Sequence, residues 1–119
     1  MNRHPDRIAD YLQQIAESIA QARKYIANHT LSSFEQDQLV QDAVIRRLEI
    51  IGEAARRIDK ADPEFIRTYP ALQLDKAYGM RNRLSHAYDV VNVTLVWDVV
   101  QQHLPSMEQA IQQHLLNHS

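Results

Sequence analysis

Apolar residues recur along this chain in steps of three and four, the spacing that places them on one face of an α-helix. A first apolar stripe covers about Pro5 to Asn28, and a second begins at a cap on Ser32 or Ser33 and runs to about Lys60. No segment shows the alternation of apolar and polar residues that marks a half-buried strand. The pattern therefore predicts an all-α protein that begins with two long helices.

Prolines divide the middle of the chain. The sequence Asp62-Pro-Glu predicts the start of a short helix, which should end near Tyr69 because Pro70 follows. A further helix is expected from Leu74 to about His86. The middle of the chain thus contributes one short helix and one long one.

The last apolar stripe follows residues 89–92, where the helical pattern breaks. Asn92 is a candidate N-cap, and Pro105 inside the stripe should kink the helix or end its first half. Together the stripes predict an up-and-down helical bundle of four main helices plus one short helix. Neither a repeat nor a second domain is evident, so we expect a single domain over residues 1–119.

Composition agrees with a globular protein, because 45% of residues are hydrophobic and 24% are charged. The chain has no cysteine, which excludes a disulfide framework and thiolate chemistry. The polar N-terminus leads into no apolar signal core, and no apolar run approaches the roughly 20 residues that span a bilayer. The expected location is therefore the cytoplasm, with no membrane contact.

The net charge of −2 does not point to a nucleic-acid-binding protein, but its distribution is uneven. Between Arg46 and Arg83 nine Lys/Arg face six Asp/Glu, a local balance of +3, whereas the rest of the chain carries −5. Solvated helix faces with uneven charge would explain this asymmetry, and so would a local phosphate site. The charge pattern permits the second explanation without requiring it.

Reactive side chains are densest in the stretch Arg81-Asn-Arg-Leu-Ser-His-Ala-Tyr88. Arginine offers a planar fork of donors to phosphate, and histidine exchanges protons near pH 7. An RNA 2′-hydroxyl that attacks its neighbouring phosphate needs a base for its proton and fixed positive charge for the developing oxyanion. The stretch holds both kinds of group and in principle needs no metal. Alone, His86 would be an ordinary surface or capping residue and Tyr88 a packing residue.

Helical geometry complicates the choice of arginine. On an ideal helix Arg81 and His86 point about 140° apart, whereas Arg83 is about 60° from His86. Geometry alone therefore favours Arg83. For Arg81 to act with His86, either the helix distorts or ends near His86, or the two groups come from different chains.

The stretch from Arg81 to His86 resembles the R-X4-6-H motif of HEPN domains. With Tyr88 it resembles the R-X4-H-X-Y form found in HepT-like toxins of HepT/MntA toxin–antitoxin systems. The segment Arg47-Leu-Glu-Ile-Ile-Gly-Glu-Ala-Ala55 is similar to the second-helix signature of the family, and Gly79-Met80 precede the arginine as they commonly do there. The likeness extends over nearly the whole chain.

This resemblance implies a metal-independent endoribonuclease, the toxin of a type VII-like toxin–antitoxin system. It implies a homodimer whose two motifs line one cleft that takes RNA without a cofactor. Arg81 carries over as the phosphate-binding residue and His86 as the catalytic histidine, with Asn82 and Arg83 in support. Tyr88 carries over as the residue to which the partner, an MntA-like minimal nucleotidyltransferase antitoxin, attaches AMP.

Two alternative functions remain open on the sequence alone: a non-catalytic binding module, and a plain structural dimer module, which would explain the helices but not the dense motif. HEPN-like bundles also serve as non-catalytic modules that bind nucleotides or assist a nucleotidyltransferase, and in such a module Arg81 would bind a phosphate and His86 would only donate. Separately, His114 and His118 are four residues apart and could share a metal ion on one helical face. We expect no metal there, because the pair lies at the frayed end of the chain with no carboxylate beside it in sequence.

Overall fold

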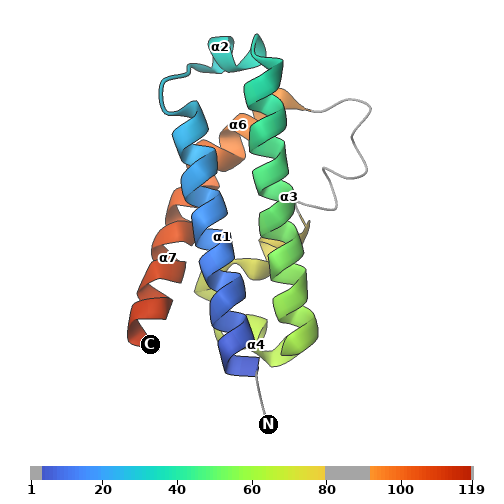
Figure 1. Ribbon diagram of the computed structural model, residues 1–119, viewed down its shortest axis with the longest axis vertical. Coiled ribbons are helices and arrows are strands. Elements are labelled where there is room, and N and C mark those ends of the chain that lie inside the picture. The colour runs from blue at the N-terminus through green and yellow to red at the C-terminus, as the bar shows by residue number, and fades with distance from the viewer. Residues whose placement is uncertain (1–3, 80–91, 119) are drawn as a thin grey trace.

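The computed structural model describes residues 4–79 and 92–118, and within these ranges every regular element is helical, as predicted (Figure 1). The two longest helices, α1 (His4–Ile26) and α3 (Gln38–Ala61), run antiparallel and pack along each other. Ile15 and Ile19 of α1 and Leu48 of α3 are fully buried. Each such side chain stabilises the fold by roughly 1.5–3 kcal/mol when buried. The contact between α1 and α3 is the most extensive between described elements, so these two helices form the main part of the core.

The boundary between the first two helices was predicted wrongly. We expected one helix capped by Ser32 or Ser33, but a short helix, α2 (Leu31–Glu35), precedes α3. Thr30 is the N-cap of α2 and forms a capping box with Ser33. The Ser33 N–H donates to the Thr30 hydroxyl at 3.1 Å, and the Thr30 N–H donates to the Ser33 hydroxyl at 2.9 Å. Ser33 therefore lies inside the short helix and is not its cap.

A second cap separates α2 from α3. The Asp37 carboxylate accepts a hydrogen bond from the Val40 N–H at 3.1 Å, which starts a new helix. The Gln41 side-chain amide then donates to the Phe34 carbonyl at 2.8 Å, so a carbonyl at the end of α2 is satisfied across the break. The Phe34 ring is fully buried and lies against Trp97, with 5.4 Å between ring centroids. Trp97 is partly buried and packs against the core through this contact.

The proline-divided middle of the chain folds as predicted where the structure describes it. The short helix α4 (Pro63–Thr68) has proline in its first turn, and a 3₁₀ turn, η1 (Pro70–Leu72), follows it. Gln73 then takes a left-handed backbone conformation with φ of 58°. This residue ends the turn, and residues 74–79 are helical. The predicted continuation of that helix to about His86 lies outside the described residues.

The last apolar stripe begins at the predicted cap. The Asn92 side-chain oxygen accepts from the Leu95 N–H at 2.9 Å and starts α6 (Val93–Asp98). The helix then widens into a π-turn, η2 (Val99–His103), before α7 (Leu104–Asn117). The predicted role of Asn92 is thereby confirmed.

Pro105 explains the π-turn. Proline has no N–H to donate to the carbonyl four residues earlier, and its ring clashes with that carbonyl in a regular helix. The chain relieves this conflict by bonding the Leu104 N–H to the Val99 carbonyl, five residues back. The prediction that Pro105 would interrupt the last helix is confirmed.

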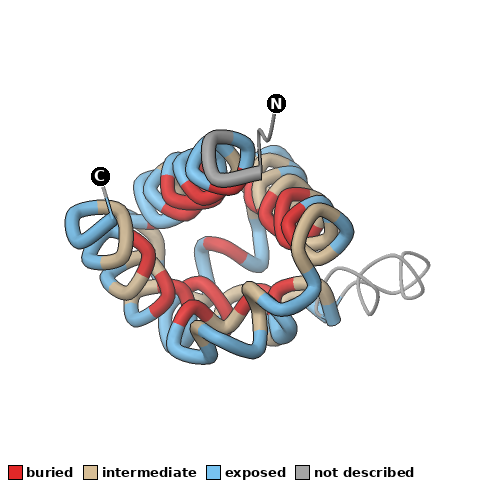
Figure 2. Tube along the Cα trace, turned by 90° about the horizontal axis from the view of Figure 1, so that it is seen from below, coloured by how far each residue is buried: buried red, intermediate tan, exposed pale blue. Residues whose placement is uncertain are grey.

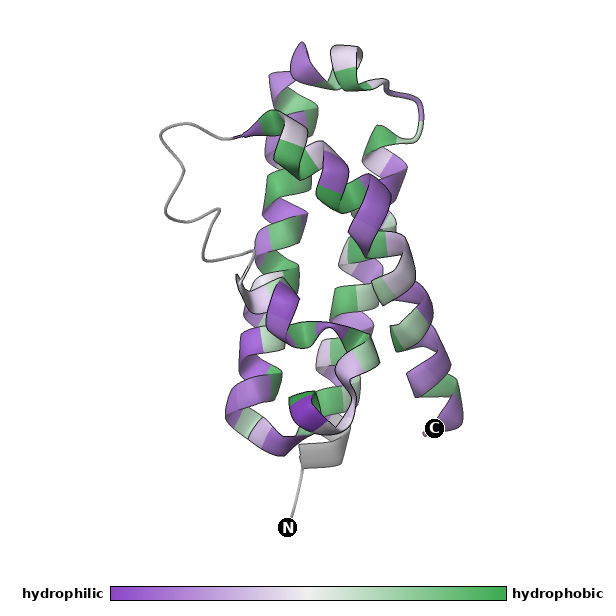
Figure 3. Ribbon diagram, turned by 180° about the vertical axis from the view of Figure 1, so that it is seen from behind, coloured by the Kyte–Doolittle hydropathy of each residue, from purple (hydrophilic) through white to green (hydrophobic). Residues whose placement is uncertain are grey.

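The long helices of the bundle enclose one core. Seen along the bundle, buried positions of the helices face inward and exposed positions face outward (Figure 2). α7 packs against α1, and the start of α1 and the end of α7 lie at the same end of the bundle (Figure 1). Hydrophilic and hydrophobic residues mix along each helix (Figure 3), and among the described residues no helix is long and apolar enough to cross a membrane.

Candidate active site and the pocket beside it

The predicted active-site residues lie in the segment 80–91, outside the described residues: Arg81, Asn82, Arg83, His86 and Tyr88. The structure describes the chain on both sides of this segment. On one side, residues 74–79 are helical, and Gly79 is the last described residue before the segment. On the other side, Asn92 is the first described residue and caps α6. The described part of the site is therefore what surrounds these two ends.

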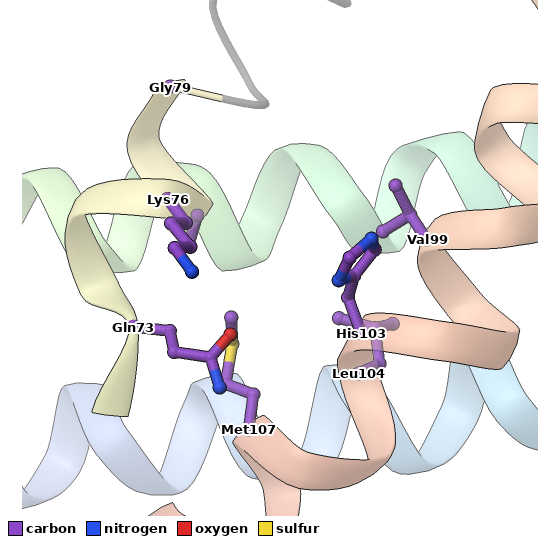
Figure 4. A pocket seen from close by; sticks show the side chains of 8 residues that line it. Gln73, Lys76, Gly79, Val99, His103, Leu104 and Met107 are labelled. Atoms are coloured by element: carbon purple, nitrogen blue, oxygen red, sulfur yellow. The ribbon is translucent and has the colours of Figure 1, made fainter. Parts of the chain in front are cut away.

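A pocket of about 340 Å³ lies at Gly79, between residues 73–79 and the turn that joins η2 to α7 (Figure 4). We call it the Gly79 pocket. The apolar side chains that line it, among the described residues, belong to the buried core. Three polar side chains complete the described lining. The apolar residues are Ala77, Val99, Leu104 and Met107, and the polar ones are Gln73, Lys76 and His103.

Lys76 and His103 reach the Gly79 pocket from different elements and lie on opposite sides of it (Figure 4). Both side chains are exposed, and no ion pair or side-chain hydrogen bond joins either of them to another described residue. Gln73 is held in place, because its amide N–H donates to the Ser106 hydroxyl at 3.2 Å. The Ser106 hydroxyl in turn donates to the His103 carbonyl at 3.2 Å. The pocket thus has a fixed amide and two donors without partners in the described chain.

The π-turn determines where His103 lies. This residue is the last of η2 and immediately precedes α7, so the widened turn that Pro105 enforces sets the direction of its side chain. Single π-turns inside α-helices occur frequently at functional sites. The Gly79 pocket is therefore built on an irregularity that the sequence specifies.

Charge distinguishes the Gly79 pocket from two other pockets of the bundle. A pocket of about 580 Å³ on α1 and α3 includes Glu49 and Glu53 in its lining, and one of about 500 Å³ near the chain ends includes Asp62 and Glu64. None of the described residues that line the Gly79 pocket is acidic. The pocket of about 580 Å³ also includes Arg46 and Arg57, so of the three the Gly79 pocket is the one whose described lining has a lysine and no carboxylate to offset it.

The two histidines considered as metal ligands form an aromatic cluster. The rings of His114 and His118 stack with centroids 4.1 Å apart, and the rings of His114 and Tyr69 make a T-shaped contact with centroids 4.6 Å apart. The His118 ring nitrogen Nδ1 lies 2.9 Å from the His114 carbonyl, which occupies one possible ligand atom. Among the described residues no group of three or more His, Cys, Asp or Glu is arranged to hold a metal ion.

Burial lowers the pKa of His114, and the nearby charge of His118 lowers it further. The unfolded chain therefore binds a proton near the ordinary histidine pKa of about 6.5, while folded His114 resists protonation until a lower pH. Its contribution to the free energy of unfolding is at its full value above pH 6.5 and falls as the pH drops toward the folded pKa.

We expect His114→Gln to reduce the loss of stability between pH 7.5 and 5.5, measured by urea unfolding. An unchanged pH dependence would contradict this role, and His103→Gln, at an exposed ring, is the control.

Sequence reasoning missed Lys76, His103 and Gln73. Lys76 stands in a helix with other charged residues, and His103 is far from it in the chain, so neither suggests a site alone. Only the fold brings them to one pocket. The available signal was Pro105, since a proline in an apolar stripe marks an irregular turn whose neighbours can point in unusual directions.

Comparison with known proteins gives a consistent result. The family model described as "Ribonuclease HepT-like" matches residues 15–114. The chain is similar to "Probable ribonuclease HepT" of Thermococcus cleftensis, at 37% identity over 99 residues, covering 83% of this chain and 87% of that protein. It is also 31% identical over 96 residues to a candidate RNase of Methanocaldococcus jannaschii, covering 81% and 77% of the two chains. No solved structure was found to match it.

Proposed function

The chain belongs to the HepT-like ribonuclease family, and from this premise we propose that it is a toxin that cleaves RNA without a metal ion. The observation that carries the proposal is the extent of the family match, which covers residues 15–114 and so includes the whole stretch from Arg81 to Tyr88. That stretch holds a general base and fixed positive charge within eight residues. The expected place of action is the cytoplasm.

In the proposed reaction His86 takes the proton from an RNA 2′-hydroxyl, whose oxygen attacks the adjacent phosphorus. Arg81 binds the phosphate and meets the negative charge that develops on its oxygens. Asn82 and Arg83 support the site as further donors. The bond from phosphorus to the 5′-oxygen breaks, and a proton must return to that oxygen as it leaves. No step of this reaction needs a metal ion or a cofactor.

We propose that two copies of the chain form a homodimer and that both motifs line one cleft. This arrangement would let Arg81 of one chain act with His86 of the other, which removes the conflict of about 140° between them on a single ideal helix. A symmetric dimer is also the commonest assembly of a small protein. Light scattering at micromolar concentration should give twice the mass of the chain, and a monomer would contradict the shared cleft.

A nucleotidyltransferase of the MntA type is the proposed antitoxin, and Tyr88 is the proposed site of AMP transfer. The added phosphate would compete with RNA for the arginines of the motif.

The alternative function is a non-catalytic module that binds nucleotides or assists a nucleotidyltransferase. The density of the Arg81–Tyr88 stretch favours the toxin, because such a module has no need of a base beside a phosphate site.

Expression of the chain in bacteria separates the two functions. A toxin should arrest growth when expressed alone, because RNA is cut, and His86→Ala should restore growth at equal protein level. Co-expression of the partner nucleotidyltransferase should also restore it. If the chain is expressed in folded form and growth continues, the helper function is favoured over the toxin.

A further inference from the structure

The Gly79 pocket combines an apolar lining with nitrogen donors, which is the combination that a nucleotide requires. We propose that it binds one nucleotide of the RNA substrate, with the base against Val99, Leu104 and Met107 and the phosphate between Lys76 and His103. This inference rests on the proposed ribonuclease function. It adds a substrate subsite to the motif that begins two residues after Gly79.

The apolar side of the pocket suits the face of a base. Leu104, Met107 and Val99 are 1%, 3% and 5% exposed, so they belong to the packed core and are held in position. Among the described residues, a Cβ added at Gly79 would meet no atom within 4 Å, so none of them crowds the pocket beside Gly79. Its volume of about 340 Å³ falls within the range of about 300–1,000 Å³ typical of small-ligand sites. One base fits such a space, whereas a folded RNA element does not.

The polar side suits a phosphate. Lys76 supplies a positive charge on a flexible stem, and an imidazole N–H of His103 can donate from the opposite side. The described lining contains no carboxylate that would repel the anion or pair with Lys76. Gln73 keeps its amide oxygen available, since its N–H is bonded to Ser106, and can accept from a base edge. The three side chains thus provide for phosphate and base together.

The first measurement is RNA binding by fluorescence anisotropy. His86→Ala should be the background for every protein, so that bound RNA stays intact. Lys76→Ala should weaken binding of a short single-stranded RNA about tenfold, as expected for the loss of about 1.4 kcal/mol. It should also lower the slope of log affinity against log salt by about 0.7, the value for one phosphate contact to a single strand. His103→Ala should weaken binding in the same direction.

Matched controls separate binding from folding and from general charge. Lys24→Ala removes an exposed lysine on α1 that is not part of the described lining of the pocket, and it should leave affinity and salt slope unchanged. Gln102→Ala changes the residue beside His103 on the same π-turn without touching the described lining. Melting temperatures of these variants should agree with that of the His86→Ala background, because Lys24, Lys76, Gln102 and His103 are exposed.

The outcomes distinguish this inference from the proposed function. If RNA is cleaved by the unaltered chain but Lys76→Ala and His103→Ala bind like the controls, the subsite is refuted and the ribonuclease stands. If RNA is bound through Lys76 and never cleaved, the ribonuclease is refuted and the subsite stands. If free AMP binds through Lys76 while RNA binding does not depend on Lys76, the pocket belongs to a mononucleotide and the RNA assignment is wrong.

Discussion

The His86→Ala protein is expected to cleave RNA about 10²–10⁴-fold more slowly than the unaltered chain, the loss typical of removing one positioned acid–base group. In the proposed reaction His86 is the group that takes the proton of the attacking hydroxyl. Without it that proton must pass to water, which is neither positioned nor sufficiently basic. The rate should be measured on a labelled single-stranded RNA with enzyme in excess over RNA, so that the cleavage step itself is observed.

A comparison of two arginine variants tests the geometry as well as the chemistry. Arg81→Ala should match the loss in His86→Ala, whereas Arg83→Ala should cost much less if Arg83 only supports the site. The reverse order would favour action within a single helix, where Arg83 is closer in direction to His86. Cleavage should persist in EDTA. Full activity of His86→Ala, or complete inhibition by EDTA, would contradict the mechanism.

The Tyr88→Phe protein is expected to escape its antitoxin completely while keeping ribonuclease activity. Phenylalanine has the same ring but no hydroxyl to receive AMP. On an ideal helix Tyr88 returns to within about 20° of Arg81, so a group attached there would stand where the RNA phosphate must bind. Incubation of the unaltered chain with the nucleotidyltransferase and ATP should add about 329 Da for each AMP, whereas Tyr88→Phe should show no added mass.

Tyr78→Phe is the matched control for this switch. Tyr78 is half-buried in the helical residues 74–79 and close in sequence to the motif, but it is not the proposed acceptor. This variant should still gain AMP and lose activity. If Tyr88→Phe is modified at another residue and silenced equally well, Tyr88 is not the switch.

Local rules predict most of the described fold, because helical periodicity and prolines act over a few residues. The stripes on α1 and α3, the proline at the start of α4 and the cap at Asn92 all follow from the sequence alone. The break between α2 and α3 does not. Four residues there can cap a helix (Thr30, Ser32, Ser33 and Asp37), and the choice of Thr30 and Asp37 depends on Phe34 reaching the core. That burial is a tertiary event, which periodicity does not report.

One part of the candidate site could likewise be predicted from the sequence, and the other part could not. The motif from Arg81 to Tyr88 is a short continuous stretch, so its chemistry can be read from the sequence, although its geometry stays a prediction. The Gly79 pocket depends on Lys76 and His103, which only the packing of α7 brings together. A pattern search along the chain has no means of pairing such residues. A site of this kind is found by asking which exposed nitrogen donors share an apolar cavity.

The π-turn at Val99–His103 also sets the direction in which the side chains of α6 point relative to those of α7. A turn closed five residues back holds one residue more than an α-turn, and one residue corresponds to about 100° of rotation about the helix axis. If a residue were deleted here and Pro105 replaced by alanine, α6 and α7 could join as one regular helix. Trp97 and His103 could then not both keep their directions: one would leave Phe34, or the other would leave the Gly79 pocket. The extra residue therefore rotates α6 relative to α7. This rotation lets Trp97 pack against the core at one end while His103 lines the Gly79 pocket at the other.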